Sequence, residues 1–296
     1  MRSSPRSGRL LSSKTRGTGA VLGLLPFSAY VILFLAIPTV LAVGSGFFTE
    51  DGRFTFANIA GVLDPAVLAT FGNSFWVSAV TAILGAVIGA LVCYAMLGTR
   101  ASGWLRSVIE SASSVLAQFG GVMLAFAFIA AIGNAGLVTV WLANTFGIDI
   151  FADRVWLYQV PGLLPVYTYF QVPLMIITFL PALEGLKSQW AEANATLGGT
   201  RFTYWTRIAA PILAPAFLGS LLLLFANAFS SYATAAALIS QGSQIVTLQI
   251  RSALISETVL GRENMAGALA LGMIVVMVVV MWGYSVLQTR TSRWQR

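Results

Sequence analysis

The stretch MAGALALGMIVVMVVVMWGYSVL, residues 265–287, carries no charged side chain over its 23 residues. A helix needs about 20 predominantly apolar residues to cross a bilayer, and lipid offers no hydrogen-bond partner to exposed backbone amides. Strands and irregular segments leave those amides unpaired, whereas a helix pairs them internally. The stretch therefore predicts a transmembrane helix.

Five further stretches meet the same requirement, and together the six contain a single charged residue, Glu110. We therefore expect an all-α polytopic membrane protein with six transmembrane helices. The five stretches are 21–48, 72–97, 108–132, 160–183 and 211–239.

The composition of the whole chain agrees with a membrane location. Of 296 residues, 57% are hydrophobic and only 9% are charged, against about 25% charged in an average soluble domain. Cys93 is the single cysteine and histidine is absent, which excludes an internal disulfide, histidine-dependent triads and the HExxH zinc site. We expect no catalytic residue, no metal site and no bound cofactor.

Basic residues indicate how the chain is oriented. Arg2, Arg6, Arg9, Lys14 and Arg16 precede the first apolar stretch, and cytoplasmic loops are enriched in Lys and Arg. Placing this tail inside the cell puts most of the 17 basic residues in the cytoplasm. We therefore expect a bacterial-type inner-membrane protein with both termini cytoplasmic, its positive charge facing anionic lipid rather than nucleic acid. The first apolar stretch exceeds the roughly 7–15 residues of a signal-peptide core, so we expect a retained helix.

The fourth connection, residues 184–210, is long for a link between antiparallel helices and is predicted to be cytoplasmic. Leu186, Trp190, Ala193 and Leu197 recur there at spacings of four, three and four, which predicts an amphipathic helix with a narrow apolar face. Gly198 and Gly199 supply a stop. Such a helix could lie on lipid headgroups, pack on the chain itself or dock a partner protein.

The order of residues in this connection resembles the "EAA loop" of permease subunits of binding-protein-dependent ABC importers. That pattern is E-A-A-x3-G-x9-I-x-L-P, and this chain has Glu192-Ala193-Asn194, Gly198, Ile208 and Pro211 at the same spacings. Asn194 replaces the second Ala, and Ala210 replaces the Leu. The tract Gly72-Asn73-Ser74-Phe75 also resembles the start of the permease core, so the resemblance covers most of the chain.

The resemblance implies that the coupling loop 184–210 carries a coupling helix, which is seated on a cytoplasmic ATPase. It implies two ABC ATPase subunits, a second homologous or identical permease subunit and an extracytoplasmic substrate-binding protein as partners. It divides the chain into a basic tail (1–20), a first helix with its outer loop (21–71), a permease core (72–289) and a C-terminal tail (290–296). The residues expected to act in coupling are Leu186, Trp190, Glu192, Ala193, Asn194, Leu197, Gly198, Ile208 and Pro211.

The chain lacks a nucleotide site of its own in its sequence. A P-loop requires G-x-x-x-x-G-K-[ST], and neither Lys14 nor Lys187, the only lysines, follows such a pattern. We therefore expect a non-enzymatic subunit whose ATP is bound by the partner.

Polar residues inside the predicted spans are candidates for lining a solute pathway, because they are costly in lipid. Each could instead bond to its own helix or pack between helices. The candidates are Gln118, Tyr167, Gln171, Asn227, Ser230, Ser231 and Tyr232. The tract 229–234 resembles the spermidine/putrescine branch of importers, which implies a polyamine-like solute.

Two other readings compete with the importer. A stand-alone secondary transporter or channel usually carries an ionisable group within the membrane, and none is evident at mid-span. A polytopic membrane enzyme would need paired acids or histidine.

Gly85 and Gly89 form a G-x-x-x-G pair, which predicts close packing of two helices.

Overall fold

The computed structural model describes residues 24–99, 103–152, 155–239, 245–255 and 263–292. The basic tail expected over 1–20 and the last residues of the C-terminal tail lie outside these ranges. The helices are the first one, Leu24–Ser45, whose second half is α2 (Ile37–Ser45), followed by α3 (Ala57–Val62), α4 (Pro65–Met96), α5 (Trp104–Leu116), α6 (Gly121–Ile132), α7 (Leu137–Phe146), α8 (Leu163–Glu184), α9 (Ser188–Thr196), α10 (Arg201–Tyr204), α11 (Ala210–Phe229), α12 (Ala233–Leu238), α13 (Val246–Ile255) and α14 (Glu263–Ser292).

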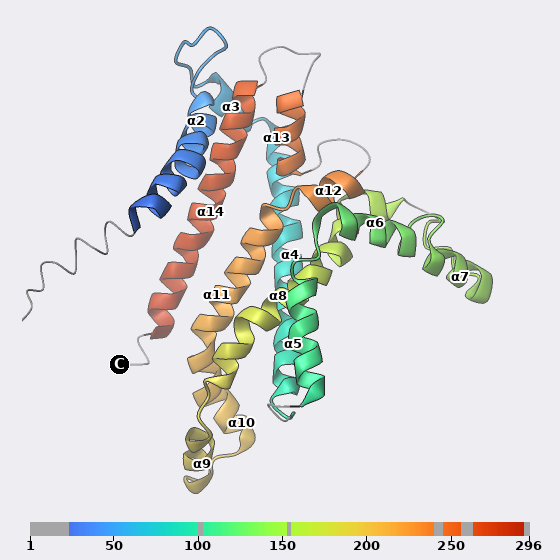
Figure 1. Ribbon diagram of the computed structural model, residues 1–296, viewed down its shortest axis with the longest axis vertical. Coiled ribbons are helices and arrows are strands. Elements are labelled where there is room, and N and C mark those ends of the chain that lie inside the picture. Colours follow the sequence, from blue (N-terminus) through green and yellow to red (C-terminus); the bar gives the residue numbers. More distant parts are fainter. Residues whose placement is uncertain (1–23, 100–102, 153–154, 240–244, 256–262, 293–296) are drawn as a thin grey trace, which may run out of the picture.

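Six helical segments of the described chain are long and apolar enough to cross a membrane, as the sequence predicts. Figure 1 shows α4, α8 and α11 running along the long axis, with α9 and α10 at one end and α3 and α13 at the other. The first helix starts, and α14 ends, toward the α9 end of the molecule. We call the two ends of the bundle the α9 end and the α13 end.

The centre of the bundle is the packing of α4 against α8. A Cβ atom added to Gly85 would lie 2.6 Å from Cβ of Gln171, and one added to Gly89 would lie 2.5 Å from Cβ of Met175. Real Cβ atoms do not approach so closely, so these two positions require glycine for the backbones to meet. The predicted role of the G-x-x-x-G pair in close helix packing is confirmed.

The third predicted span is broken. Residues 108–132 were expected to form one helix, but α5 ends at Leu116 and α6 begins at Gly121. Gly121 has φ of +71°, a left-handed conformation that glycine adopts without strain. The third segment long enough to cross is Gly121–Phe146, which comprises α6 and α7.

The fifth predicted span, 211–239, is also different. Its helix begins earlier, because α10 continues through a π-helical turn (Trp205–Ala209) into α11. At the other end α11 stops at Phe229, and α12 begins only at Ala233. The two breaks are joined, since the Gly121 N–H donates a hydrogen bond of 2.9 Å to Thr234 Oγ1 and α6 packs against α12.

The fourth predicted span contains Pro173 and Pro181, and each proline lacks the N–H that a helix interior uses. Nevertheless α8 runs unbroken from Leu163 to Glu184 with both prolines inside it. Neighbouring helices can accommodate proline within a membrane helix. Because α8 remains continuous, it connects the break between α11 and α12, where Tyr167 contacts Ser231, directly to α9.

Candidate functional site

Residues 186–205 form a projection at the α9 end of the bundle, which we call the α9–α10 hairpin (Figure 1). α9 ends at Thr196, and Gly198 has φ of +76°. The helix therefore stops at the glycines, as the sequence predicts. The left-handed conformation reverses the chain, and α10 begins three residues later, at Arg201.

Asn194 holds the corner of the hairpin closed. Its Nδ2 donates to the carbonyl of Thr200 at 3.1 Å, and its own carbonyl accepts the Gly199 N–H at 2.8 Å. The Thr200 side chain in turn accepts the Thr203 N–H at 3.2 Å and caps α10. The polar side chain at position 194 thus braces the turn within the chain.

The predicted apolar face of the hairpin is not one continuous stripe. Leu186 precedes α9 and packs against the core of the bundle, and Trp190 is partly buried beside Lys187. Leu197 instead is 87% exposed, and Phe202 across the corner is 77% exposed. The hairpin is therefore anchored by Leu186 and presents Leu197 and Phe202 outward.

The other predicted coupling residues are distributed along the hairpin and its return. Glu192 and Ala193 are exposed on α9. Ile208 lies partly buried in the π-helical turn, and Pro211 lies exposed in the first turn of α11. Between the hairpin and the end of α4 there is a cavity of about 610 Å³, bordered by Tyr94 and Asn194.

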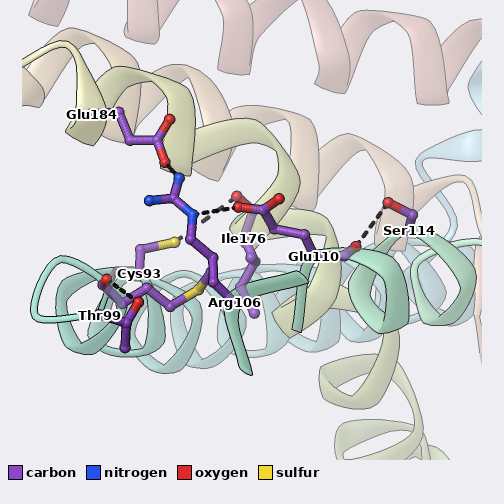
Figure 2. A network of polar contacts seen from close by, with 8 residues as sticks. Cys93, Thr99, Arg106, Glu110, Ser114, Ile176 and Glu184 are labelled. Atoms are coloured by element: carbon purple, nitrogen blue, oxygen red, sulfur yellow. Dashed lines mark hydrogen bonds and ion pairs between the residues drawn. The ribbon is translucent and has the colours of Figure 1, made fainter. Parts of the chain in front are cut away.

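An ion-pair network ties α5 to the end of α8, immediately before the hairpin (Figure 2). The Arg106 guanidinium binds Glu110 through a 2.8 Å Nε–Oε1 contact, and its Nη2 contacts Glu184 Oε1. The Arg106 side chain is only 15% exposed. The charge of Glu110, conspicuous in the sequence, is thus neutralised one turn away.

Two of the predicted pathway residues, Tyr167 and Ser231, are hydrogen-bonded to each other inside the protein. Tyr167 is 1% exposed, and its hydroxyl donates to the carbonyl of Ser231 at 3.1 Å. Thr247 Oγ1 donates to the same carbonyl at 3.4 Å. Ser231 follows the end of α11 and precedes α12, so its carbonyl belongs to neither helix and needs another donor. These hydroxyls therefore stabilise the break between α11 and α12.

Gln171 is also enclosed. It is 0% exposed between α4 and α8, and its Nε2 donates to Thr81 Oγ1 at 2.8 Å. Its Oε1 has no hydrogen-bond partner within the described part of the chain. In the single chain this side chain lies in a helix interface rather than on an open surface.

The four remaining candidates, Gln118, Asn227, Ser230 and Tyr232, are exposed. Gln118 lies in the break between α5 and α6, and the other three lie at or near the break between α11 and α12. Ser230 and Tyr232 line a cavity of about 430 Å³ that Arg251 also lines.

Arg251 is not among the site residues expected from the sequence. The structure places it in α13, a short apolar helix that packs on α14 and α4. A lone arginine within the apolar run 246–255 is the signal that could have identified it.

Across the residues that the structure describes, no three His, Cys, Asp or Glu side chains gather as a metal site would require.

No protein-family profile matches the chain, but individual proteins are similar to it. It is 24% identical over 251 residues to a probable ABC transporter permease protein, y4fN, of Sinorhizobium fredii, covering 84% of this chain and 42% of that protein. It is 23% identical over 214 residues to a putative ferric transport system permease protein, FbpB 1, of Haemophilus influenzae, covering 72% of this chain and 33% of that protein. The chain thus spans less than half the length of these two relatives.

A shorter relative is matched over most of its length. The sulfate transport system permease protein CysT of Escherichia coli is 24% identical over 225 residues, covering 75% of this chain and 76% of that protein. The thiamine transport system permease protein ThiP of Haemophilus influenzae is 24% identical over 229 residues, covering 75% of this chain and 38% of that protein.

Solved structures show the same arrangement of helices. A chain of a bacterial ABC transporter involved in the import of the acidic polysaccharide alginate matches with a TM-score of 0.71 at 17% identity, over 96% of this chain and 99% of that one. A second structure, of that type of transporter with an alginate pentasaccharide-bound periplasmic protein, matches with a TM-score of 0.70. This protein is therefore an all-α polytopic membrane protein with the fold of an ABC importer permease.

Proposed function

We propose that this chain is the membrane permease subunit of an ABC importer, which forms part of a solute pathway and is driven by a separate cytoplasmic ATPase. The observation that carries the proposal is the α9–α10 hairpin, which projects beyond the bundle with Leu197 and Phe202 exposed. Permease relatives and the shared fold support the same conclusion.

The exposed side chains make the hairpin suitable for docking. Removing one large apolar side chain from water contributes about 1.5–3 kcal/mol. A partner groove that covers both Leu197 and Phe202 would therefore gain this contribution to its binding free energy twice. Glu192, on the exposed part of α9, can add a polar contact at the rim. The predicted coupling role of Glu192, Ala193 and Leu197 is part of this proposal.

The hairpin is connected so that its displacement would reach the pathway. α9 follows α8 after three residues, and α10 continues without interruption toward α11. α8 and α11 contact each other and α4, and the far end of α11 is the break at Ser230–Tyr232. A pull on the hairpin would therefore move two helices that border the break.

The partners follow from the same reasoning. We propose two ABC ATPase subunits beneath the membrane, a second homologous or identical permease that completes the pathway, and a soluble substrate-binding protein outside. The subunit lies in a bacterial-type inner membrane with both termini cytoplasmic, and ATP is bound by the ATPase partners. Asn227, Ser230 and Tyr232 are our candidates for contact with the solute.

The relatives do not favour a polyamine solute. Those reported above are named for sulfate, ferric iron and thiamine, and the matched structures belong to an alginate importer. The resemblance of tract 229–234 to the polyamine branch is left without support from these names.

Co-purification tests the proposal. We expect the tagged full chain, expressed with its genomic neighbours, to retain a P-loop ATPase. The Leu197→Asp/Phe202→Asp variant should retain at least tenfold less of this ATPase. Ser188→Asp is the matched control, since Ser188 is exposed on α9 and lies about half a turn around the helix from Leu197. Solute accumulation by the chain alone under an ion gradient would instead establish a stand-alone secondary transporter.

A further inference from the structure

The cavity at the break between α11 and α12 has one charged residue, Arg251, among its described lining residues. It has a volume of about 430 Å³ and is lined by Ser230 and Tyr232 from the break, Thr247 and Arg251 from α13, and Met273 from α14. Because the break is where the exposed pathway candidates gather, Arg251 lies beside the proposed solute path.

The Arg251 guanidinium carries the charge of the cavity wall. The side chain is exposed, and among the described residues the ion pairs are those of Arg106 with Glu110 and Glu184. No carboxylate in that part of the chain pairs with Arg251. An unpaired charge in apolar surroundings is unfavourable until an opposite charge joins it.

The hydrogen bonds of the cavity's hydroxyl groups determine which donors remain for a ligand. Ser230 Oγ donates to the carbonyl of Ala226 at 2.9 Å, and Thr247 Oγ1 donates to the carbonyl of Ser231. Both hydroxyl groups therefore donate their hydrogen to a backbone carbonyl and cannot donate it to a ligand at the same time. Tyr232 is 40% exposed, and its hydroxyl makes no hydrogen bond to another described residue. The free donors are thus the guanidinium and this phenol.

The rest of the described wall is apolar and consists of Ile250, Leu254, Ile255 and Met273. Apolar walls lower the local dielectric constant, so the field of one guanidinium extends further than it would in water. Guanidinium groups bind carboxylate, sulfate and phosphate oxygens through paired hydrogen bonds. A cationic solute would meet a like charge, and none of the described residues that line the cavity is a carboxylate.

We propose that this cavity binds the anionic group of the transported solute, a carboxylate, sulfate or phosphate, through Arg251 and Tyr232. The proposal rests on the proposed function for its transport role, and it names the solute class as anionic. It places a specificity-determining residue at the helix break, where motion of α11 would change the shape of the cavity.

Charged thiol reagents measure the potential of the cavity in the purified full chain. Cys93 is fully buried, so the unmodified chain is the blank and Ser230→Cys is the reporter. We expect a sulfonate-bearing methanethiosulfonate to react faster than a trimethylammonium-bearing one by about tenfold relative to their rates with free cysteine. Arg251→Gln removes this preference, and Arg251→Lys keeps it. Arg53→Gln is the matched control, because Arg53 is an exposed arginine in the predicted outer loop and does not line the cavity.

Protection by anions then tests binding. Millimolar sulfate or phosphate should slow labelling of Ser230→Cys severalfold compared with chloride at the same ionic strength, and this protection should vanish with Arg251→Gln. An unchanged reagent preference in Arg251→Gln overturns the proposal, as does the absence of protection by both anions. A loss of binding to a soluble partner protein with labelling unchanged would make Arg251 a docking residue and would also overturn it.

This outcome is separable from that of the proposed function. Labelling needs no ATPase, whereas the importer assignment depends on ATPase co-purification. Anion protection without a bound ATPase would refute the importer alone, and a bound ATPase without anion protection would refute the anion site alone.

Discussion

At the scale of single residues, the corner of the α9–α10 hairpin depends on one backbone conformation and one side chain. Gly198 has φ of +76°, and no heavy atom lies within 4 Å of the position its Cβ would occupy. A side chain there would meet no steric contact, but the left-handed conformation costs about 1–2 kcal/mol for most residues. The effect of substitution is therefore on the direction of the turn.

Gly198→Asp should reduce ATPase-coupled uptake strongly while leaving insertion into the membrane nearly unchanged. Asp places a negative charge beside Leu197 on the surface proposed to dock, and the change lies outside the spans. Uptake and ATPase activity in proteoliposomes measure it, with Gly198→Asn as the control, because Asn has nearly the same shape and also tolerates positive φ but carries no charge. Normal coupled transport by Gly198→Asp would contradict the docking role of the hairpin.

Arg106 acts at the same scale, because it connects α5 to the end of α8 (Figure 2). Arg106→Gln should lower ATPase coupling and cost no more than about 1 kcal/mol of stability, since its acidic partners are partly exposed and screened. A double-mutant cycle with Glu184→Gln measures the pairing. If the two substitutions have fully additive effects on coupling, the pair does not position the hairpin.

At the scale of elements, the approach of α4 to α8 decides whether the bundle closes. Gly89 faces Met175 with no room for a Cβ atom, so Gly89→Leu should destabilise the protein by about 1–3 kcal/mol through overpacking. Thermal unfolding in detergent is the measurement. Gly44→Leu is the matched control, because nothing lies within 4 Å of its Cβ position. Equal melting temperatures for the two variants would refute the packing argument.

The broken helices show why elements could be predicted only in part. The predicted span 108–132 is apolar along most of its length, yet it is interrupted before Gly121. The predicted span 211–239 ends its first helix at Phe229, among the polar residues that suggested a pathway. Hydropathy reports how well a segment suits lipid, whereas a break depends on partners for the freed backbone groups.

At the scale of the whole molecule, the orientation of the bundle in the membrane is set by charge. Positive residues favour the cytoplasm, so the α9 end should lie inside and the loop that holds Asp51 outside. Leu197→Cys should therefore react with an impermeant thiol reagent only in permeabilised cells, and Asp51→Cys in intact cells. Cys93 is buried and supplies no background. The reverse pattern would invert the orientation and remove the proposed contact with a cytoplasmic ATPase.

Some properties of this protein could be read from local sequence, because they depend on neighbours along the chain. The helical class, the number of spans, the glycine corner at Gly198 and the close-packing pair Gly85 and Gly89 are of this kind, since length, hydropathy and backbone freedom act over a few residues.

Other properties came from packing between distant segments. Thr234 receives the Gly121 N–H, and Tyr167 and Thr247 together satisfy the carbonyl of Ser231. These partners lie between 16 and 113 residues apart along the chain, so no local pattern announces them. The position of Arg251 beside Ser230 and Tyr232 has the same origin. A buried backbone group must find a hydrogen bond wherever the fold supplies one, and that choice is made in three dimensions.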